Sequence, residues 1–158
     1  METEQITKQL TSVALCAKEI RKVLKENFPK IKFRVRSSNF SMGDSVHVSW
    51  TDGPTDKKVK ELIGHFQYGH FDGMTDMYEY SNSREDIPQT KYLSCDRNLS
   101  EEIVRKCAEK YKKEWGLNEP TEDLGHSFEH NGQWYNWHQI AWKELMDVDL
   151  KESEENAN

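Results

Sequence analysis

The sequence has no long apolar run, no paired cysteines and no complete catalytic motif. Its first residues, METEQITKQL, are polar, and no apolar stretch approaches the ~18 residues of a membrane span, so neither a signal peptide nor a membrane anchor is expected. Cys16, Cys95 and Cys107 form no Cys-x-x-Cys pair, which argues against a paired-thiol metal site. An odd number of thiols predicts reduced, buried cysteines in a soluble, cytoplasmic protein.

The usual signatures of catalysis are also missing. The chain contains no Gly-x-Ser-x-Gly elbow, no phosphate-binding P-loop and no His-Glu-x-x-His pair. The sequence therefore leans away from an enzyme, and it implies no cofactor.

Charged residues make up 32% of the 158 residues and hydrophobic residues only 35%, a polar composition for one domain. Five Trp, six Tyr and six Phe compensate, so an aromatic-rich core is expected. The net charge of −6 is uneven: residues 1–97 carry 15 Lys and Arg against 14 Asp and Glu, whereas residues 98–158 carry 7 against 14. Such a chain does not look like a general DNA binder, and its acidic second half suits a basic protein surface.

Periodic apolar residues predict an α+β fold. Residues 37–45 are expected to form a connection longer than the tightest hairpin turn, and residues 67–77 an ordered loop. Asn131-Gly132 predicts a hairpin turn. The predicted helices cover residues 6–28, 55–66, 100–115 and 137–147, and the predicted strands cover 31–35, 46–50, 78–80, 91–95 and a hairpin at 128–135.

The expected order is therefore α-β-β-α-β-β-α followed by a C-terminal hairpin and helix. Two to three helices would pack on a small antiparallel sheet, because that arrangement buries the apolar helix stripes. We expect one domain over residues 1–147, with a C-terminal hairpin-helix extension at about 126–147. The acidic residues 148–158 are expected to form a disordered tail.

One candidate site combines the turn after the second strand with the 67–77 loop. Trp50, Asp52 and Gly53 lie in a turn that starts a helix, where backbone amides can receive an anion, although Asp52 or ordinary turn chemistry can satisfy those amides instead. His70, Asp72 and Asp76 offer imidazole and carboxylate ligands for a metal-dependent site. Their spacing matches no established ligand pattern, so no bound metal is predicted.

A second candidate is a basic strand face that consists of Lys30, Lys32, Arg34 and Arg36, with His47 across from it. Sheet faces with basic and aromatic residues bind single-stranded nucleic acid. Trp50 is predicted on the opposite, apolar face, so a solvated face is the favoured interpretation.

A third candidate is the aromatic C-terminal segment. Tryptophan and tyrosine are enriched at binding hot spots, but they also fill cores, and packing onto the main domain is at least as well supported. The residues concerned are Trp134, Tyr135, Trp137 and Trp142.

Dense segments in the first two thirds of the chain match a known pattern. They include VSWTDGPT at residues 48–55 and GHFDGM at residues 69–74, followed by KYLSCDRNLS. Over residues 17–115 the chain resembles the large polyvalent protein associated domain 29 family. The resemblance implies an origin in a phage or conjugative element and implies no catalytic chemistry.

Three functions follow from these observations. The leading hypothesis is a non-enzymatic interaction protein of a mobile element that counters a host defence by binding a host protein. The first alternative is a nucleic-acid-binding module, and the second is a small metal-dependent enzyme. The sequence favours a protein partner and no membrane partner, and it leaves the oligomeric state open.

Overall fold

The computed structural model describes residues 11–150. These residues group into two compact units, which are described separately below. Of the described residues, the first unit contains 11–29 together with Phe33–Val48 and Leu62–Cys95. The second contains Lys30–Lys32, Ser49–Glu61 and residues 96–150.

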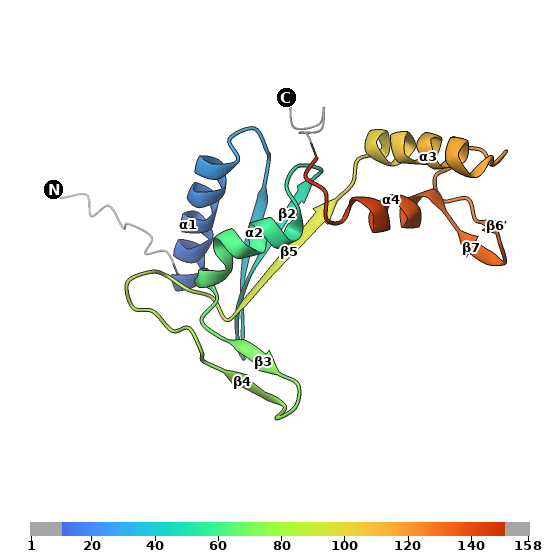
Figure 1. Ribbon diagram of the computed structural model, residues 1–158. Helices are drawn as coiled ribbons and strands as arrows, with labels where there is room; N and C mark the ends of the chain where they lie inside the picture. The colour runs from blue at the N-terminus through green and yellow to red at the C-terminus, as the bar shows by residue number, and fades with distance from the viewer. Residues whose placement is uncertain (1–10, 151–158) are drawn as a thin grey trace. The chain divides into compact units, whose positions relative to one another are not determined.

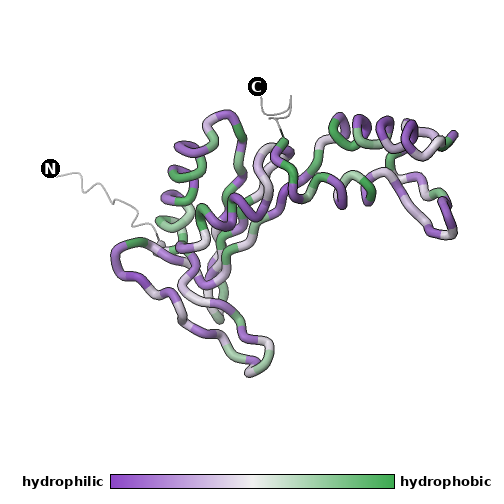
Figure 2. The backbone as a smooth tube through the Cα atoms, viewed as in Figure 1, coloured by the Kyte–Doolittle hydropathy of each residue, from purple (hydrophilic) through white to green (hydrophobic). Residues whose placement is uncertain are grey.

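The first helix, α1 (Ser12–Asn27), packs against strand β1 in the first unit. Thr11 caps its start, because the Thr11 side chain accepts a hydrogen bond from the amide of Ala14 at 3.3 Å. Its apolar stripe is buried as predicted, and Figure 2 shows apolar and polar residues alternating along the helix. The predicted start at Ile6 lies outside the described residues. The buried residues are Val13, Cys16, Ala17, Ile20 and Leu24.

Strands β1 (Arg34–Phe40) and β2 (Gly43–Thr51) form a hairpin joined only by Ser41 and Met42. The prediction that residues 37–45 form the connection is wrong, because all of these residues except Ser41 and Met42 belong to the two strands. Beyond Val35 every residue of β1 is exposed, so no alternation of apolar and polar residues reveals the strand.

The third strand of this sheet is β5 (Tyr92–Asn98), which lies beside β2 (Figure 1). The Asp44 carboxylate accepts from the amide of Lys91 at 2.8 Å, and His47 Nδ1 lies 2.7 Å from Ser94 Oγ. Residue numbers therefore increase together along β2 and β5, and these two strands run in the same direction. The α+β class and the element order are confirmed, while this pair makes the sheet mixed.

Between β2 and β5 the chain forms α2 (Asp56–Ile63), a 3₁₀ turn η1 (Gly64–Phe66) and a short hairpin. The hairpin pairs β3 (His70–Asp72) with β4 (Met77–Glu79), with Phe71 opposite Tyr78. Strand β3 lies within the segment predicted as a loop, because three residues are too short to show a period.

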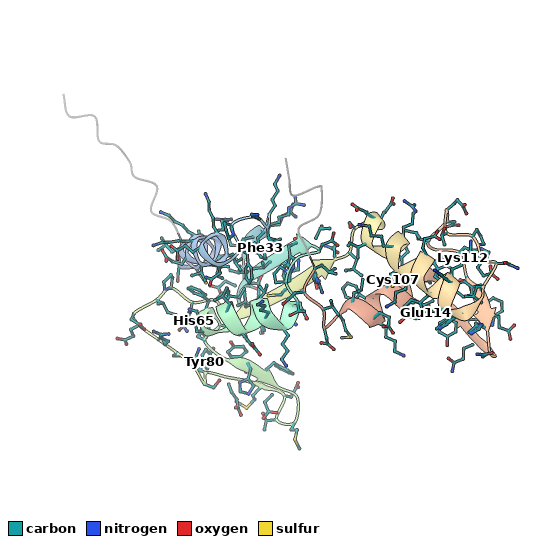
Figure 3. The ribbon with its side chains drawn as sticks, turned by 45° about the horizontal axis from the view of Figure 1, so that its top comes forward. Phe33, His65, Tyr80, Cys107, Lys112 and Glu114 are labelled. Carbon is teal, nitrogen blue, oxygen red and sulfur yellow. The ribbon has the colours of Figure 1, made fainter. Side chains whose placement is uncertain are left out.

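The second unit contains α3 (Glu101–Trp115), the hairpin β6 (Phe128–His130) and β7 (Gln133–Tyr135), and α4 (Trp137–Leu145). Asn131 and Gly132 both have positive φ, 50° and 79°, as expected for the predicted tight turn. Helices α3 and α4 pack together around an aromatic-rich core, and Cys107 lies on the side of α3 facing α4 (Figure 3). The buried cluster contains Val104, Cys107, Ala108, Leu124, Phe128, Trp137, Ile140 and Ala141.

Candidate binding surfaces

The turn after β2 places Asp52 in the interior of the second unit. Asp52 is fully buried and has a left-handed φ of 56°. Its carboxylate accepts from the amide of Ser100 at 2.9 Å and from the Ser100 hydroxyl at 2.7 Å. Ser100 in turn caps α3 through the amide of Ile103. The Asp52 carboxylate thus links the end of β2 to the start of α3.

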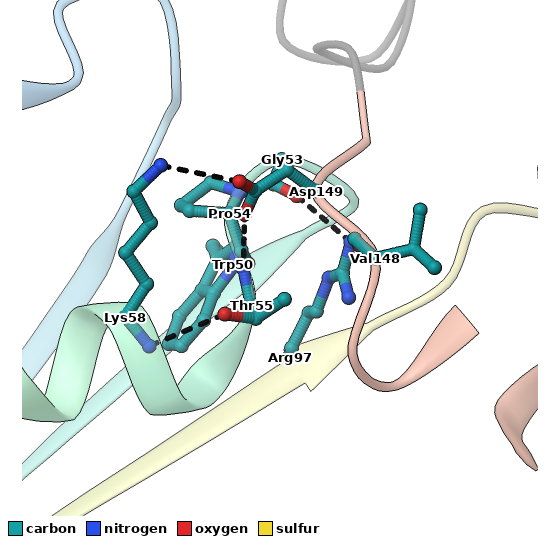
Figure 4. Close-up of polar contacts among 8 residues, drawn as sticks. All are labelled: Trp50, Gly53, Pro54, Thr55, Lys58, Arg97, Val148 and Asp149. Atoms are coloured by element: carbon teal, nitrogen blue, oxygen red, sulfur yellow. Dashed lines mark hydrogen bonds and ion pairs between the residues drawn. The ribbon is translucent and has the colours of Figure 1, made fainter.

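Arg97 lies on β5 beside this turn and is almost fully buried. Its guanidinium donates to four backbone carbonyl oxygens. Nη2 donates to Gly53 at 2.8 Å and to Val148 at 2.7 Å, two residues that Figure 4 draws beside Arg97. Nε donates to Asp52 at 3.3 Å and Nη1 to Leu145 at 2.9 Å. Burial lowers the pKa of Arg97, and the neighbouring carboxylates, Asp52 foremost, partly oppose that shift. Arg97 therefore holds the segment after α4 against the turn.

A carboxylate does occupy the start of α2, and it belongs to Asp149. Asp149 accepts from the amide of Thr55 at 3.1 Å and from Nζ of Lys58 at 3.1 Å (Figure 4). These hydrogen bonds, led by that of Thr55, lower the pKa of Asp149. The amide of Leu150 also donates to the carbonyl of Gly53 at 2.8 Å. Residues 148–150, which the sequence places in the tail, are thus bound to this turn, and residues 151–158 lie outside the described part.

Trp50 belongs to the same structural network. Its indole Nε1 donates to the carbonyl of Pro54 at 3.0 Å, and the ring is buried. The candidate residues Trp50, Asp52 and Gly53 therefore form the interior of the second unit, where their polar groups already have partners in the chain.

The other members of that candidate site, His70, Asp72 and Asp76, lie in the β3–β4 hairpin of the first unit. Asp72 accepts from the amide of Met74 at 2.9 Å and from the hydroxyl of Thr75 at 3.0 Å, and these bonds lower its pKa. His70 lies 3.4 Å from Glu79 across the hairpin. Within residues 11–150, no group of three or more His, Cys, Asp and Glu side chains is placed to hold a metal ion.

The tip of this hairpin displays apolar side chains that sequence analysis did not single out. Met74 is 96% exposed, Met77 65% and Phe71 55%. We call these three exposed residues around the hairpin tip the hairpin patch; Phe71 lies on one face of the hairpin and Met77, opposite Asp72, on the other. The glycine and aspartate residues of this segment predict a loop. The one feature of the sequence that could have indicated an exposed apolar tip was the presence of Phe and Met beside these turn residues.

The predicted basic strand face is split between the two units. Lys30 and Lys32 precede β1 and belong to the second unit, whereas Arg34 and Arg36 lie on β1 in the first. Both arginines are exposed, and alternation places them on the side of the sheet opposite buried Val35. His47 occupies the same outer side of β2, where it contacts Ser94.

The outer side of the sheet also carries aromatic rings that the sequence analysis missed. Phe40 on β1 stacks with Tyr92 on β5, with centroids 6.2 Å apart and planes at 23°. Trp50, the ring that the sequence places on the opposite, apolar face, is buried on the inner side of the sheet as predicted. Phe40 was not predicted on this face because the sequence analysis placed it in the connection at residues 37–45.

The four aromatic residues of the C-terminal candidate divide into core and surface. Trp137 is fully buried and donates from Nε1 to the carbonyl of Pro120 at 2.8 Å. Tyr135 packs edge-on against Trp115. Trp134 and Trp142 are exposed, at 70% and 52%. Only these last two have rings available to a partner.

The cysteines are free thiols, and all three are buried. Burial raises the pKa of Cys16 to about 12 and also raises the pKa of Cys107. Both thiols therefore lack the thiolate character that a nucleophile needs. In the described part of the chain, no helix has the length and apolar character required to cross a membrane.

The chain is similar to a family of known proteins. The model of the family described as large polyvalent protein associated domain 29 matches residues 11–104. This range covers α1, the three-stranded sheet and the start of α3. No curated protein and no solved structure matches the chain.

Proposed function

Because the chain belongs to the large polyvalent protein associated domain 29 family, we propose that it is an interaction module of a mobile genetic element and that its partner is a protein. Membership in this family associates the chain with phages and other mobile elements. The partner we propose is a host protein, including one that serves in host defence, in the cytoplasm of the infected cell. The free thiols support a reducing compartment.

The observation that carries this proposal is the hairpin patch. Met74, Met77 and Phe71 are all exposed on one short hairpin, although Met77 pairs with Asp72 and so lies on the opposite face from Phe71. Methionine and aromatic side chains are enriched in the cores of protein interfaces, and methionine adapts its shape to irregular partner surfaces.

The hairpin is also built to hold its shape, which favours binding. Asp72 fixes the turn through Met74 and Thr75, and Asp76 adopts a left-handed φ of 55°. At the base, Tyr78 donates from its hydroxyl to the carbonyl of Lys91 at 2.6 Å. A fixed turn loses less conformational freedom when a partner binds. His70, Asp72 and Asp76 thus act as supports of the patch in this proposal.

The hairpin patch is surrounded by negative charge. Asp72, Asp76 and Glu79 flank it, and the only titratable base among hairpin residues 70–79 is His70. Exposed carboxylates around an apolar centre suit a partner surface that is apolar at its centre and basic at its rim.

The test is affinity capture from nuclease-treated bacterial lysate, followed by mass spectrometry. The wild-type chain is compared with a Met74→Ser, Met77→Ser variant and with a Trp134→Ser variant, which alters an exposed ring of the second unit. We expect one stoichiometric protein in the wild-type and Trp134→Ser samples and its loss in the double variant. Capture that survives the double variant but not Trp134→Ser would move the interface to the second unit. Capture of no protein by any sample would overturn the proposal.

A further inference from the structure

A row of aromatic rings runs from the outer side of the β1–β2–β5 sheet to the base of the β3–β4 hairpin, entirely within the first unit. Phe40 stacks on Tyr92, and Tyr92 lies edge-on to Tyr78 with centroids 5.7 Å apart. Tyr78 contacts Tyr80 at 5.1 Å, and Tyr80 stacks in parallel on Tyr68 at 5.5 Å with planes at 5°. We call these five residues the aromatic row.

The row is open to solvent where it could receive a ligand. Tyr80 is 64% exposed, Phe40 47% and Tyr92 39%. Tyr78 is the fixed centre: its hydroxyl binds the Lys91 carbonyl, and burial raises its pKa to about 12, so it stays protonated. Exposed rings supported by a fixed centre form a surface on which flat groups can stack.

Positive charge lies on the row at Lys91 and along β1, the strand that carries Phe40. Nζ of Lys91 lies 5.0 Å from the ring centroid of Tyr78 and 5.5 Å from that of Tyr92. Arg34 and Arg36 share the outer side of β1 with Phe40, because alternate residues of a strand face the same way. Lys91 therefore lies at the rings themselves, and the two arginines lie four and six residues before Phe40 on the same side of β1.

We propose that the first unit binds single-stranded nucleic acid, with unpaired bases stacked on the aromatic row and the phosphates beside Arg34, Arg36 and Lys91. Flat rings on an open sheet bind unpaired bases by stacking, while cations follow the backbone. The hydrogen-bonded pair of His47 and Ser94 on the same face offers polar groups to base edges. This activity is separate from the hairpin patch and does not depend on it.

The charge balance selects a single strand over a duplex. The chain has a net charge of −6, whereas tight duplex binding rests on many phosphate contacts. In a duplex the base faces are hidden inside the stack, so the aromatic row could not reach them. In a single strand each base exposes a face. Stacking on the aromatic row then adds affinity that three cations could not supply by themselves.

The experiment measures fluorescence anisotropy of labelled oligonucleotides of about 20 residues: single-stranded DNA, single-stranded RNA and duplex DNA. Binding is followed from about 50 to about 200 mM salt. We expect single strands to bind more tightly than the duplex. The DNA and RNA arms identify which strand the sheet prefers.

Two variants test the two halves of the site. Phe40→Leu with Tyr92→Leu keeps apolar volume but removes stacking, and should weaken single-strand binding by about tenfold or more. Arg34→Gln with Arg36→Gln should weaken binding and reduce the slope of log affinity against log salt by about 1.4, the value for two phosphate contacts.

Matched controls are Lys22→Gln with Lys25→Gln, which removes two exposed cations from α1, and the Met74→Ser, Met77→Ser variant. Both should bind oligonucleotide as the wild type does, given unchanged circular dichroism spectra. Absence of single-strand binding at about 50 mM salt, or equal loss in the α1 control, would overturn the proposal. The proposal would also be overturned if the wild type bound no oligonucleotide and the Phe40→Leu, Tyr92→Leu variant lost protein capture. That result would assign the aromatic row to the protein partner.

Discussion

The Asp52 carboxylate accepts both the backbone amide and the hydroxyl of Ser100, at 2.9 and 2.7 Å, inside the second unit. The two residues are separated by 48 positions in the chain. Both hydrogen bonds are buried, so their loss leaves polar groups without water. The turn at Asp52, within the family motif at residues 48–55, therefore stabilises the fold.

Replacing Asp52 should destabilise the second unit. Asp52→Ala leaves the amide and hydroxyl of Ser100 unsatisfied and places alanine at a positive φ, so we expect a loss on the order of 3 kcal/mol in the free energy of unfolding. Asp52→Asn should lose less, because asparagine tolerates this φ and its oxygen can accept one bond. Urea unfolding followed by circular dichroism measures both. Equal stabilities of Asp52→Ala and the wild type would contradict the assigned role.

Arg97 should control the segment that follows α4. Arg97→Lys removes the planar fork that reaches Gly53, Leu145 and Val148 together. We expect faster hydrogen exchange at the amide of Leu150, which donates to Gly53. Arg105→Lys, a change on an exposed position of α3, is the control and should leave that exchange rate unchanged. An equal effect of both variants would argue against the Arg97 contact.

Gly69 should be essential for the β3–β4 hairpin. A Cβ at this position would overlap the backbone carbonyl of Glu79 and crowd the ring of Tyr78 at 2.5 Å. Gly69→Ala should therefore distort the hairpin and abolish protein capture by the hairpin patch. Gly64→Ala is the matched control, since nothing lies within 4 Å of a Cβ there. Normal capture by Gly69→Ala would show that the hairpin pairing is not required.

Asp149 gives stability a dependence on pH. Its folded pKa is lowered by hydrogen bonds from Thr55 and Lys58, so its contribution is present above the unfolded carboxyl pKa of about 3.9 and is lost as the pH falls through the folded value. Asp149→Asn should thus be less stable than the wild type at neutral pH, and the difference should fade in acid. Urea midpoints across pH measure this. A difference that stays constant into acid would exclude the carboxylate as its source.

The buried thiols should resist modification. Cys16 has a pKa raised to about 12 by burial, and Cys95 and Cys107 are buried as well. A thiol-specific reagent at mildly alkaline pH should react with the native protein only as fast as the protein unfolds, and with all three thiols in denaturant. Rapid reaction in the native state would contradict the burial of whichever cysteine mass spectrometry identifies.

Much of the fold could be predicted because its signals are local. The apolar stripe of α1, the serine cap of α3 and the Asn131-Gly132 turn each depend on neighbouring residues. Strands that lack a buried face gave no such signal. The end of β1 and the short β3 are exposed, so no alternation marked them.

The candidate sites were harder to predict, since they depend on which residues meet. The sequence favoured turn chemistry or Asp52 as the partner of the amides at the start of α2, and the carboxylate found there is that of Asp149, 94 residues from Thr55 in the chain. His70, Asp72 and Asp76 serve the hairpin turn in the first unit, whereas Trp50, Asp52 and Gly53 are interior to the second. The sequence analysis had combined the turn and the loop that hold these six residues into one candidate site.

By itself the sequence determined the α+β class, the order of the elements and the family, because periodicity, caps and motifs are written in consecutive residues. Only the tertiary structure decided that Asp52 and Arg97 are interior, that Met74 is exposed, and that Phe40 meets Tyr92 across the sheet. These features depend on pairing between distant segments, and each strand register fixes at once which side chains are buried and which reach solvent.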